Sequence, residues 1–272
     1  MGKIRKIISV VVPVFNEEKT VKKVFETLLK SSLINEIIAV NDGSTDKSLD
    51  LLRDFKKQIK LISYKKNHGK GYALAQGLKK AKNEIVIFLD SDLVGLSVEH
   101  VQALLSPFND KRIKAVLGYS MPRKNHFFAK SFISINVTGQ RSYYKKDLLP
   151  HLGEIAKTKY GVEIFLNSLF KRKETKKIPL INLTHVWTYQ KYKPHKALRQ
   201  YFKLGTEIAK EVGKTKFKEY KQTSNNGLKL VKKEINDKLL AKGFNPLFYW
   251  SLVNYYYKKL DLKNFLNYLF KE

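Results

Sequence analysis

The chain has no cysteine among its 272 residues. This absence excludes disulfide bonds, thiolate nucleophiles and cysteine-bound metal or iron–sulfur sites. It is compatible with a cytoplasmic location, which we expect for this chain.

Long hydrophobic runs are also missing. The apolar stretch near the N-terminus is interrupted by Pro13, Asn16 and Glu17, well short of the roughly 20 residues that a membrane-spanning helix needs. We therefore expect neither a signal peptide nor a transmembrane segment, and we interpret this stretch as a buried strand. Any association with the inner face of a membrane would then be peripheral.

Two glycine-rich nucleotide-binding loops are absent. No GxxxxGK[ST] sequence occurs, and no GxGxxG opens the first expected helix, which disfavours P-loop ATPases and dinucleotide oxidoreductases. A sugar-phosphate nucleotidyltransferase should carry a glycine-rich, arginine-containing first loop. The chain has Phe15-Asn16-Glu17-Glu18 at that place instead.

Acidic residues are scarce. The chain has 24 Asp and Glu against 53 Lys and Arg, a formal net charge of +29. Such an excess indicates a polyanionic partner, which can be an anionic membrane surface, a nucleic acid or a phosphorylated small molecule. The hydrophobic content of 43% is ample for a buried core.

Apolar runs rich in β-branched residues alternate with segments of helical spacing. We expect strands at Ile7–Val14, Glu36–Val40, Ile59–Ser63, Glu84–Leu89, Ala115–Tyr119 and Lys177–Leu183. We expect helices at Glu17–Ser31, Asp46–Phe55, Gly71–Ala81, Val98–Ser106 and Tyr160–Lys171. This alternation predicts an α/β fold with a doubly wound, mostly parallel sheet. We expect a core domain over residues 1–190 and a basic, aromatic-rich helical extension over residues 191–272.

Three of the expected strands run directly into acids, in the segments VVPVFNEE (Val11–Glu18), IIAVNDGSTD (Ile37–Asp46) and IVIFLDSD (Ile85–Asp92). Ligands of open parallel sheets bind in the crevice beyond the carboxyl ends of the strands. The three segments therefore predict one shared site that is rich in carboxylates.

The last of these segments predicts a metal site. Asp90 and Asp92 are spaced to hold one hard divalent cation, Mg²⁺ or Mn²⁺, bridged to a diphosphate. The alternative is a pair of acids that only ends a strand and opens a turn.

The other two segments predict contacts to a nucleoside. Asp42 can accept a hydrogen bond from a base N–H or a ribose hydroxyl, or belong to a simple Asn-Asp-Gly turn. Glu17 can hold a nucleoside, or lie in the first turn of a helix where the helix dipole favours an acid. Lys70, between Gly69 and Gly71 before a helix, predicts an anion site.

Together, VPVFNEE, NDGSTD, NHGKG and FLDSD resemble the family 2 glycosyltransferases of the GT-A fold, particularly polyprenyl-phosphate sugar synthases and related glycolipid enzymes. The resemblance covers roughly Ile7–Val186. It implies an inverting transfer of a sugar from a UDP- or GDP-linked donor to a membrane-associated acceptor, with Mg²⁺ or Mn²⁺. It implies the following roles: Pro13, Phe15, Glu17 and Asp42 around the nucleoside, Lys70 near base or phosphate, Asp90 for ribose or metal, and Asp92 as a direct metal ligand.

The acceptor side is predicted from the second half of the chain. Glu163 is the candidate general base, or else an ordinary exposed carboxylate at a helix N-terminus. Similar enzymes carry a histidine after a strand in this region, which makes His185 a candidate third metal ligand, although a single histidine can be structural. Arg141, in a segment similar to the Gly-x-Arg segment of the family, is expected to contact a phosphate. The alternative to a lipid is a soluble acceptor such as a phosphorylated small molecule, with a retaining or an inverting transfer.

The C-terminal part is strongly basic, with 24 Lys or Arg and 8 Asp or Glu from Lys171 onward. Aromatic residues alternate with lysines over Phe244–Phe270, which suits an anionic membrane surface or a helical cap on the core. A protein that binds nucleic acid or another anionic surface, without enzymatic activity, is the competing class. We expect no nucleic-acid partner, because the ordered carboxylates would repel its phosphates.

Overall fold

A computed structural model describes residues 7–121, 138–158 and 161–186. The expected helical extension over residues 191–272 and the expected boundary at residue 190 lie outside these ranges. Within the described ranges, no helix combines the length and the apolar character needed to cross a bilayer.

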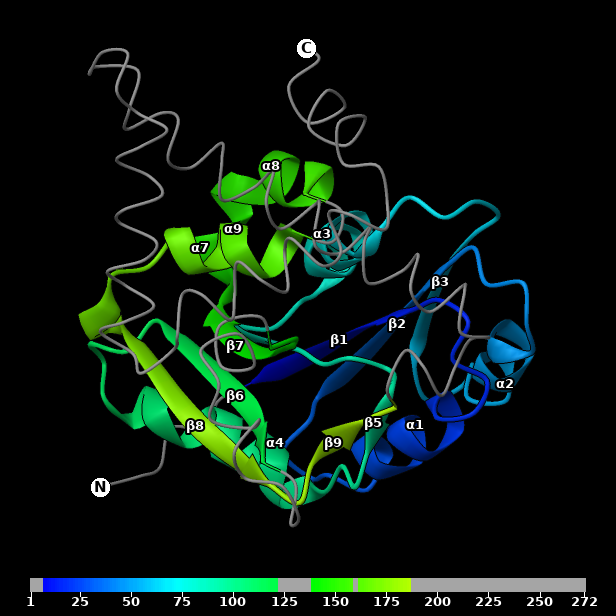
Figure 1. Ribbon diagram of the computed structural model, residues 1–272, viewed down its shortest axis with the longest axis horizontal. Coiled ribbons are helices and arrows are strands. Elements are labelled where there is room, and N and C mark those ends of the chain that lie inside the picture. Colours follow the sequence, from blue (N-terminus) through cyan, green and yellow to red (C-terminus); the bar gives the residue numbers. More distant parts are fainter. Residues whose placement is uncertain (1–6, 122–137, 159–160, 187–272) are drawn as a thin grey trace, which may run out of the picture. The chain divides into compact units, whose positions relative to one another are not determined.

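The described part is built on a seven-stranded sheet with the order β3-β2-β1-β4-β7-β6-β8 (Figure 1). The strands are β1 (Ile8–Val14), β2 (Glu36–Asp42), β3 (Lys60–Tyr64), β4 (Ile85–Phe88), β6 (Ala115–Met121), β7 (Gln140–Tyr144) and β8 (Thr175–Ile181). Strands β1 to β4 pair in parallel, and β6 and β8 also pair in parallel. The α/β fold class is therefore confirmed.

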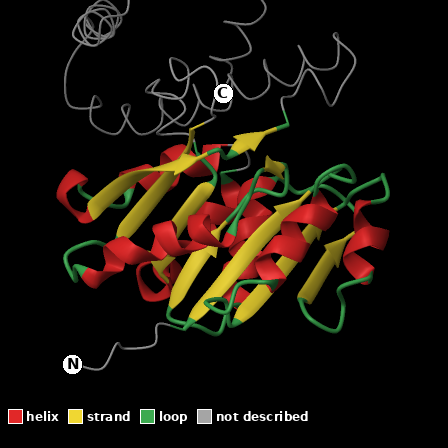
Figure 2. Ribbon diagram, turned by 90° about the horizontal axis from the view of Figure 1, so that it is seen from below, coloured by secondary structure: helices red, strands yellow, loops and turns green. Residues whose placement is uncertain are grey.

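Helices cover both faces of the sheet (Figures 1 and 2). One face packs against α1 (Val21–Leu29), α2 (Ser48–Arg53) and α4 (Val98–Leu105). The other packs against α3 (Lys70–Lys80), α7 (Lys145–Leu148), α8 (Leu152–Lys157) and α9 (Val162–Ser168). Single 3-10 turns are η1 (Ser106–Asn109), η2 (Leu149–His151) and η4 (Arg172–Glu174).

Two separate hydrophobic layers explain why the central strands are apolar at every position. In β1, Val10 and Val12 belong to the layer under α1, whereas Val11 belongs to the layer under α3. All three are 0% exposed. Helix α3 comes close to β1 because Gly77 faces Val11, where an added Cβ would lie 2.2 Å from Val11 Cγ1. Gly77 permits this close approach because it has no Cβ.

The first helix begins later than predicted. It starts at Val21 rather than at Glu17, because the residues before it form a loop bonded to the β2–α2 loop. The backbone N–H groups of Asn16 and Glu18 donate to Ser44 and Asp46 of that loop, and the N–H of Glu17 donates to Ser48, the first residue of α2. These donors are thus satisfied outside the helix.

One central strand is missing from the sequence prediction. Strand β7 lies between β4 and β6 and is antiparallel to both. Arg141 of β7 pairs with Phe88 of β4 on one side and with Leu117 of β6 on the other. The sequence predicted no strand in this segment, which was noted only for its similarity to the Gly-x-Arg segment of the family. A second, two-stranded sheet pairs β5 (Leu93–Val94) with β9 (Thr184–His185).

Candidate functional site

The carboxyl ends of β2, β1 and β4 lie next to one another, because these strands are neighbours in the sheet. The structure therefore places the three acid-ended segments at one edge. The middle residue of the Asp-Ser-Asp segment helps to join them, since the Ser91 hydroxyl donates to the Pro13 carbonyl at 2.9 Å.

Asp90, Asp92 and His185 form a cluster in which one ligand atom of each lies within 4.8 Å of the others. Asp92 Oδ1 lies 3.1 Å from His185 Nδ1. The β5–β9 pairing produces this contact across 93 residues, because it sets Leu93 opposite His185. Two carboxylates and an imidazole are a donor set that fits Mg²⁺ or Mn²⁺.

His185 is also bonded on its other nitrogen, where Nε2 lies 3.1 Å from Ser120 Oγ on β6. Burial alone would lower the pKa of His185, but the hydrogen bond and the negative charge of Asp92 outweigh burial and raise it. The imidazole is thus held at both nitrogens and lies in a negative environment.

Lys70, at the start of α3, joins two acids from distant parts of the chain. Its Nζ lies 2.6 Å from Asp90 Oδ1 and 2.6 Å from Glu163 Oε1. Burial lowers the pKa of Lys70, but the charges of Asp90 and Glu163 outweigh burial and raise it above the usual lysine value. Glu163 is only 6% exposed, so the alternative of an ordinary exposed carboxylate at a helix N-terminus is wrong.

The charges of this region favour a divalent cation. Asp90, Asp92 and Glu163 contribute −3 and Lys70 contributes +1, which leaves −2 while His185 is neutral. Partly buried carboxylates cost free energy of desolvation unless a positive charge lies beside them. One Mg²⁺ or Mn²⁺ would compensate this negative charge fully.

Asp42 holds the Asn67–Gly71 loop in place. Its two carboxylate oxygens accept from the backbone N–H of His68 at 2.9 Å and of Gly69 at 2.7 Å. Gly43 follows with φ +74°, and an added Cβ there would lie 2.5 Å from the Lys66 carbonyl carbon. A direct contact between Asp42 and a nucleoside stays a prediction.

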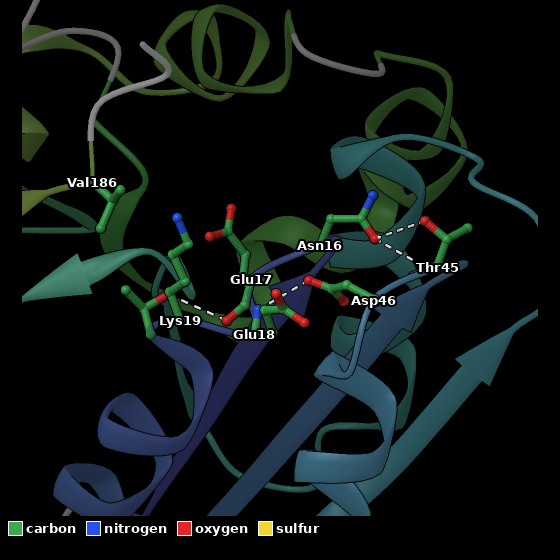
Figure 3. Close-up of a pocket in the computed structure, with 8 residues that line it drawn as sticks. Asn16, Glu17, Glu18, Lys19, Thr45, Asp46 and Val186 are labelled. Atoms are coloured by element: carbon green, nitrogen blue, oxygen red, sulfur yellow. Dashed lines mark hydrogen bonds between the residues drawn. The ribbon is translucent and has the colours of Figure 1, made fainter. Parts of the chain in front are cut away.

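The end of β1 and the loop after it carry the other residues predicted to contact a nucleoside. Pro13, Phe15 and Glu17 are each partly exposed at this end of the strand. Figure 3 shows a small pocket that Glu17 helps to line, and its dashed lines include the Glu18–Asp46 and Asn16–Thr45 hydrogen bonds. The pocket is lined by Asn16, Glu17, Glu18, Lys19, Thr20, Thr45, Asp46 and Val186.

Arg141 does not lie as expected for a phosphate contact. Its side chain is 1% exposed, and its guanidinium donates to the Thr138 carbonyl, to the Tyr143 hydroxyl at 3.3 Å and to Asn167 Oδ1 at 2.7 Å. A contact between Arg141 and a phosphate stays a prediction, and the described structure gives this guanidinium protein acceptors. In this structure Arg141 ties β7 to α9 from the inside, because a buried guanidinium needs protein acceptors.

Sequence reasoning missed the side chains that contact the cluster from β6 and β7. Gln140 Nε2 donates to Asp90 Oδ2 at 3.0 Å, and Ser120 contacts His185. Neither residue type stands out in the sequence. The only available signal was that Gln140 lies beside Gly139 and Arg141, in a segment already singled out.

Comparisons with known proteins agree with this geometry. The model of the family described as glycosyl transferase family 2 matches residues 9–192. An uncharacterized glycosyltransferase of Synechocystis sp. is 40% identical over 93 residues, covering 32% of this chain and 29% of the relative. The 4,4'-diaponeurosporenoate glycosyltransferase of Staphylococcus haemolyticus is 29% identical over 121 residues, covering 43% of this chain and 32% of the relative. The chain thus spans about a third of the length of these two curated relatives.

A solved structure shares the fold. It is glucosyl-3-phosphoglycerate synthase from Mycobacterium tuberculosis, in complex with Mn²⁺, uridine diphosphate and phosphoglyceric acid. The TM-score is 0.59 at 22% identity, with 77% of this chain and 78% of the other chain covered. This likeness, which concerns the fold alone, confirms the GT-A architecture. Since the family model covers more than half of the chain, the chain belongs to glycosyl transferase family 2.

Proposed function

We propose that this chain transfers a sugar from a nucleoside-diphosphate sugar, with Mg²⁺ or Mn²⁺ held by Asp90, Asp92 and His185. The observation that carries the proposal is the convergence of these three side chains beside the ends of the parallel strands, where three carboxylates face the single ammonium group of Lys70. A bound divalent cation would neutralise the charge that grows on the leaving diphosphate.

The remaining roles are proposed from the resemblance to the family. Pro13, Phe15, Glu17 and Asp42 would surround the nucleoside, and Lys70 would lie near base or phosphate. Asp90 would face the ribose or the cation.

Glu163 is the proposed proton acceptor for an acceptor substrate that attacks through a hydroxyl group. Its carboxylate is 6% exposed and lies 2.6 Å from Lys70 Nζ, and a carboxylate is a group that can act as a general base. An acceptor phosphate is already anionic and needs no base. The role of Glu163 therefore depends on the chemical class of the acceptor.

For the acceptor we propose a membrane-associated molecule, a polyprenyl phosphate or a glycolipid, with inversion at the anomeric carbon. The net charge of +29 supports binding at an anionic membrane surface. A soluble phosphorylated acceptor is the competing possibility.

Radiolabelled UDP- and GDP-sugars, offered with a polyprenyl phosphate, diacylglycerol or soluble phosphorylated acceptors, test donor and acceptor together. We expect transfer to a lipid acceptor. Transfer to a soluble phosphorylated acceptor alone would replace the membrane proposal while leaving the glycosyltransferase proposal intact.

Replacement of Asp92 tests the cation site. We expect Asp92→Ala to lower kcat/KM by about 100- to 1000-fold, because a preorganised group that stabilises charge in the transition state is lost. Asp54→Ala, at an exposed acid directly after α2, is the matched control and should retain activity. Unchanged transfer and unchanged donor hydrolysis in Asp92→Ala would refute the assignment.

A further inference from the structure

The last residues of β6 and the first residues of β7 lie beside the Asp90–Asp92–His185 cluster. Each strand has one side chain that hydrogen-bonds to the cluster. Ser120 lies near the end of β6, and Gln140 is the first residue of β7. The two strands pair in antiparallel register, with Gly118 opposite Gln140, so these side chains come from the same end of the pair.

The side chain of Gln140 is hydrogen-bonded to Asp90 and has one defined orientation. Its side chain is 0% exposed, its Nε2 donates to Asp90 Oδ2 at 3.0 Å, and its Oε1 lies 2.7 Å from Thr138 Oγ1. An ionised carboxylate accepts hydrogen bonds only, so the amide nitrogen must face Asp90 and the amide oxygen must face the Thr138 hydroxyl. Lys70 occupies the other oxygen of Asp90. The carboxylate is therefore held on both sides.

The segment that carries Gln140 is anchored in the interior. The backbone N–H of Gln140 donates to Thr138 Oγ1 at 3.3 Å, and the buried guanidinium of Arg141 donates to the Thr138 carbonyl. Gly139 lies directly against Asp90, where an added Cβ would be 2.1 Å from Oδ2. The position of Asp90 is thus set by buried groups that have little freedom to move.

Ser120 fixes the imidazole of His185 in a similar way. Nδ1 faces Asp92 at 3.1 Å, whereas Nε2 faces Ser120 Oγ at 3.1 Å. Nδ1 is therefore the nitrogen that is turned toward the acids. With Nε2–H donating to Ser120, Nδ1 has the lone pair that a cation requires.

We propose that Gln140 and Ser120 are positioning residues of the cation site, which orient Asp90 and His185 for a divalent cation without touching it. This inference rests on the proposed function. Side chains that hydrogen-bond metal ligands commonly affect metal affinity by about 10- to 100-fold when they are removed.

The test measures Mn²⁺ binding to the full chain from the electron paramagnetic resonance signal of free Mn²⁺. Gln140→Met keeps a similar volume and removes both hydrogen bonds of the amide, and Ser120→Ala removes the contact to Nε2. We expect each to weaken Mn²⁺ binding by about 10-fold or more. Ser142→Ala is the matched control, because its buried β7 hydroxyl donates to the Leu104 carbonyl instead of the cluster. It should bind Mn²⁺ as the unmodified chain does.

A double-substitution cycle separates positioning from general damage. Thr138→Val is nearly isosteric and removes the hydroxyl that lies 2.7 Å from Gln140 Oε1 and 2.5 Å from the Gly118 carbonyl oxygen, so it should also weaken Mn²⁺ binding. If Thr138 acts through Gln140, the pair Thr138→Val and Gln140→Met should bind Mn²⁺ no more weakly than Gln140→Met alone. Melting temperatures in EDTA show whether a variant has lost its fold. If Gln140→Met fails to fold, Thr138→Val and Ser120→Ala decide the question.

The two proposals fail in different ways. If the unmodified chain binds no Mn²⁺, or Asp92→Ala binds it equally well, the cation site itself is refuted. If the unmodified chain binds Mn²⁺ and Asp92→Ala does not, while folded Gln140→Met, Thr138→Val and Ser120→Ala bind like Ser142→Ala, the positioning roles are overturned and the cation site stands.

Discussion

Lys70 joins the acid at the end of β4 to the acid at the start of α9. Its ammonium group is shared by Asp90, at the end of β4, and Glu163, in the first turn of α9. All three side chains are less than a fifth exposed. Loss of one partner of a buried ion pair is costly because it leaves the other charge uncompensated.

We predict that Lys70→Met lowers the free energy of unfolding by about 3 kcal/mol at neutral pH. Urea unfolding followed by circular dichroism measures this change. Lys79→Met, at an exposed position near the end of the same helix, is the control and should change stability little. An equal and small effect of both substitutions would contradict the role of Lys70.

The stabilisation that Lys70 provides should not change between neutral pH and the ordinary lysine pKa. The pKa of Lys70 is raised in the folded chain, so its stabilising contribution is fully present below the ordinary lysine value of about 10.4 and is lost only as the pH rises through the raised value. The difference between the unmodified chain and Lys70→Met should therefore persist from neutral pH to about pH 10.

The charged residues of the site could be identified from the sequence, whereas the neutral side chains that hydrogen-bond to them could not. Asp90, Asp92 and Lys70 stand in short motifs whose spacing indicates chemistry by itself. Gln140 and Ser120 are ordinary polar residues, and only the pairing of β6 with β7 brings them to the cluster.

At the scale of elements, the loop after β1 and the loop after β2 are joined by hydrogen bonds. The Glu18 backbone N–H donates to Asp46 Oδ2 at 3.1 Å, and Glu18 Oε2 accepts from the Lys47 backbone N–H at 3.1 Å. Asp46 Oδ1 also accepts from the Ser48 backbone N–H at 2.9 Å, which supports the start of α2. These bonds explain why the chain after β1 stays in a loop until Val21.

Glycine is required where the β2 end meets the loop that contains Lys70. We predict that Gly43→Ala destabilises the chain by about 2 to 4 kcal/mol, from backbone strain at φ +74° and from the clash with the Lys66 backbone. Gly153→Ala is the matched control, because an added Cβ there meets nothing within 4 Å and the position lies in α8. The control should be stabilising by about 0.5 kcal/mol. Chemical denaturation compares the two, and equal stability would refute the requirement at Gly43.

Strands were predicted correctly where the sequence has continuous apolar, β-branched runs. The β-branched runs of β1, β2 and β4 are buried on both faces, as continuous apolar strands predict. Strand β7 was missed because its sequence, Gln140-Arg141-Ser142-Tyr143-Tyr144, contains three polar residues that are buried all the same. Hydrogen bonds from the surrounding strands and helices make that burial possible, and these are tertiary contacts.

At the scale of the whole molecule, the charge of +29 is the dominant feature. We predict that the full chain binds vesicles containing phosphatidylglycerol and not vesicles of phosphatidylcholine alone, and that added salt releases it, because exposed charges are screened within about 10 Å at ordinary ionic strength. Co-sedimentation measures both effects. Truncation near Phe244 should weaken the binding, and equal binding to both vesicle types would refute the membrane proposal.

The sequence by itself determined the α/β class, the order of the main elements and the acids that end β1, β2 and β4, because these depend on local periodicity and short motifs. Only the tertiary structure decided that Asp92 meets His185, that Lys70 bridges Asp90 and Glu163, and that Arg141 turns inward. The physical reason is that these contacts join segments far apart in the chain. Their geometry follows from strand order, register and burial, which no local pattern records.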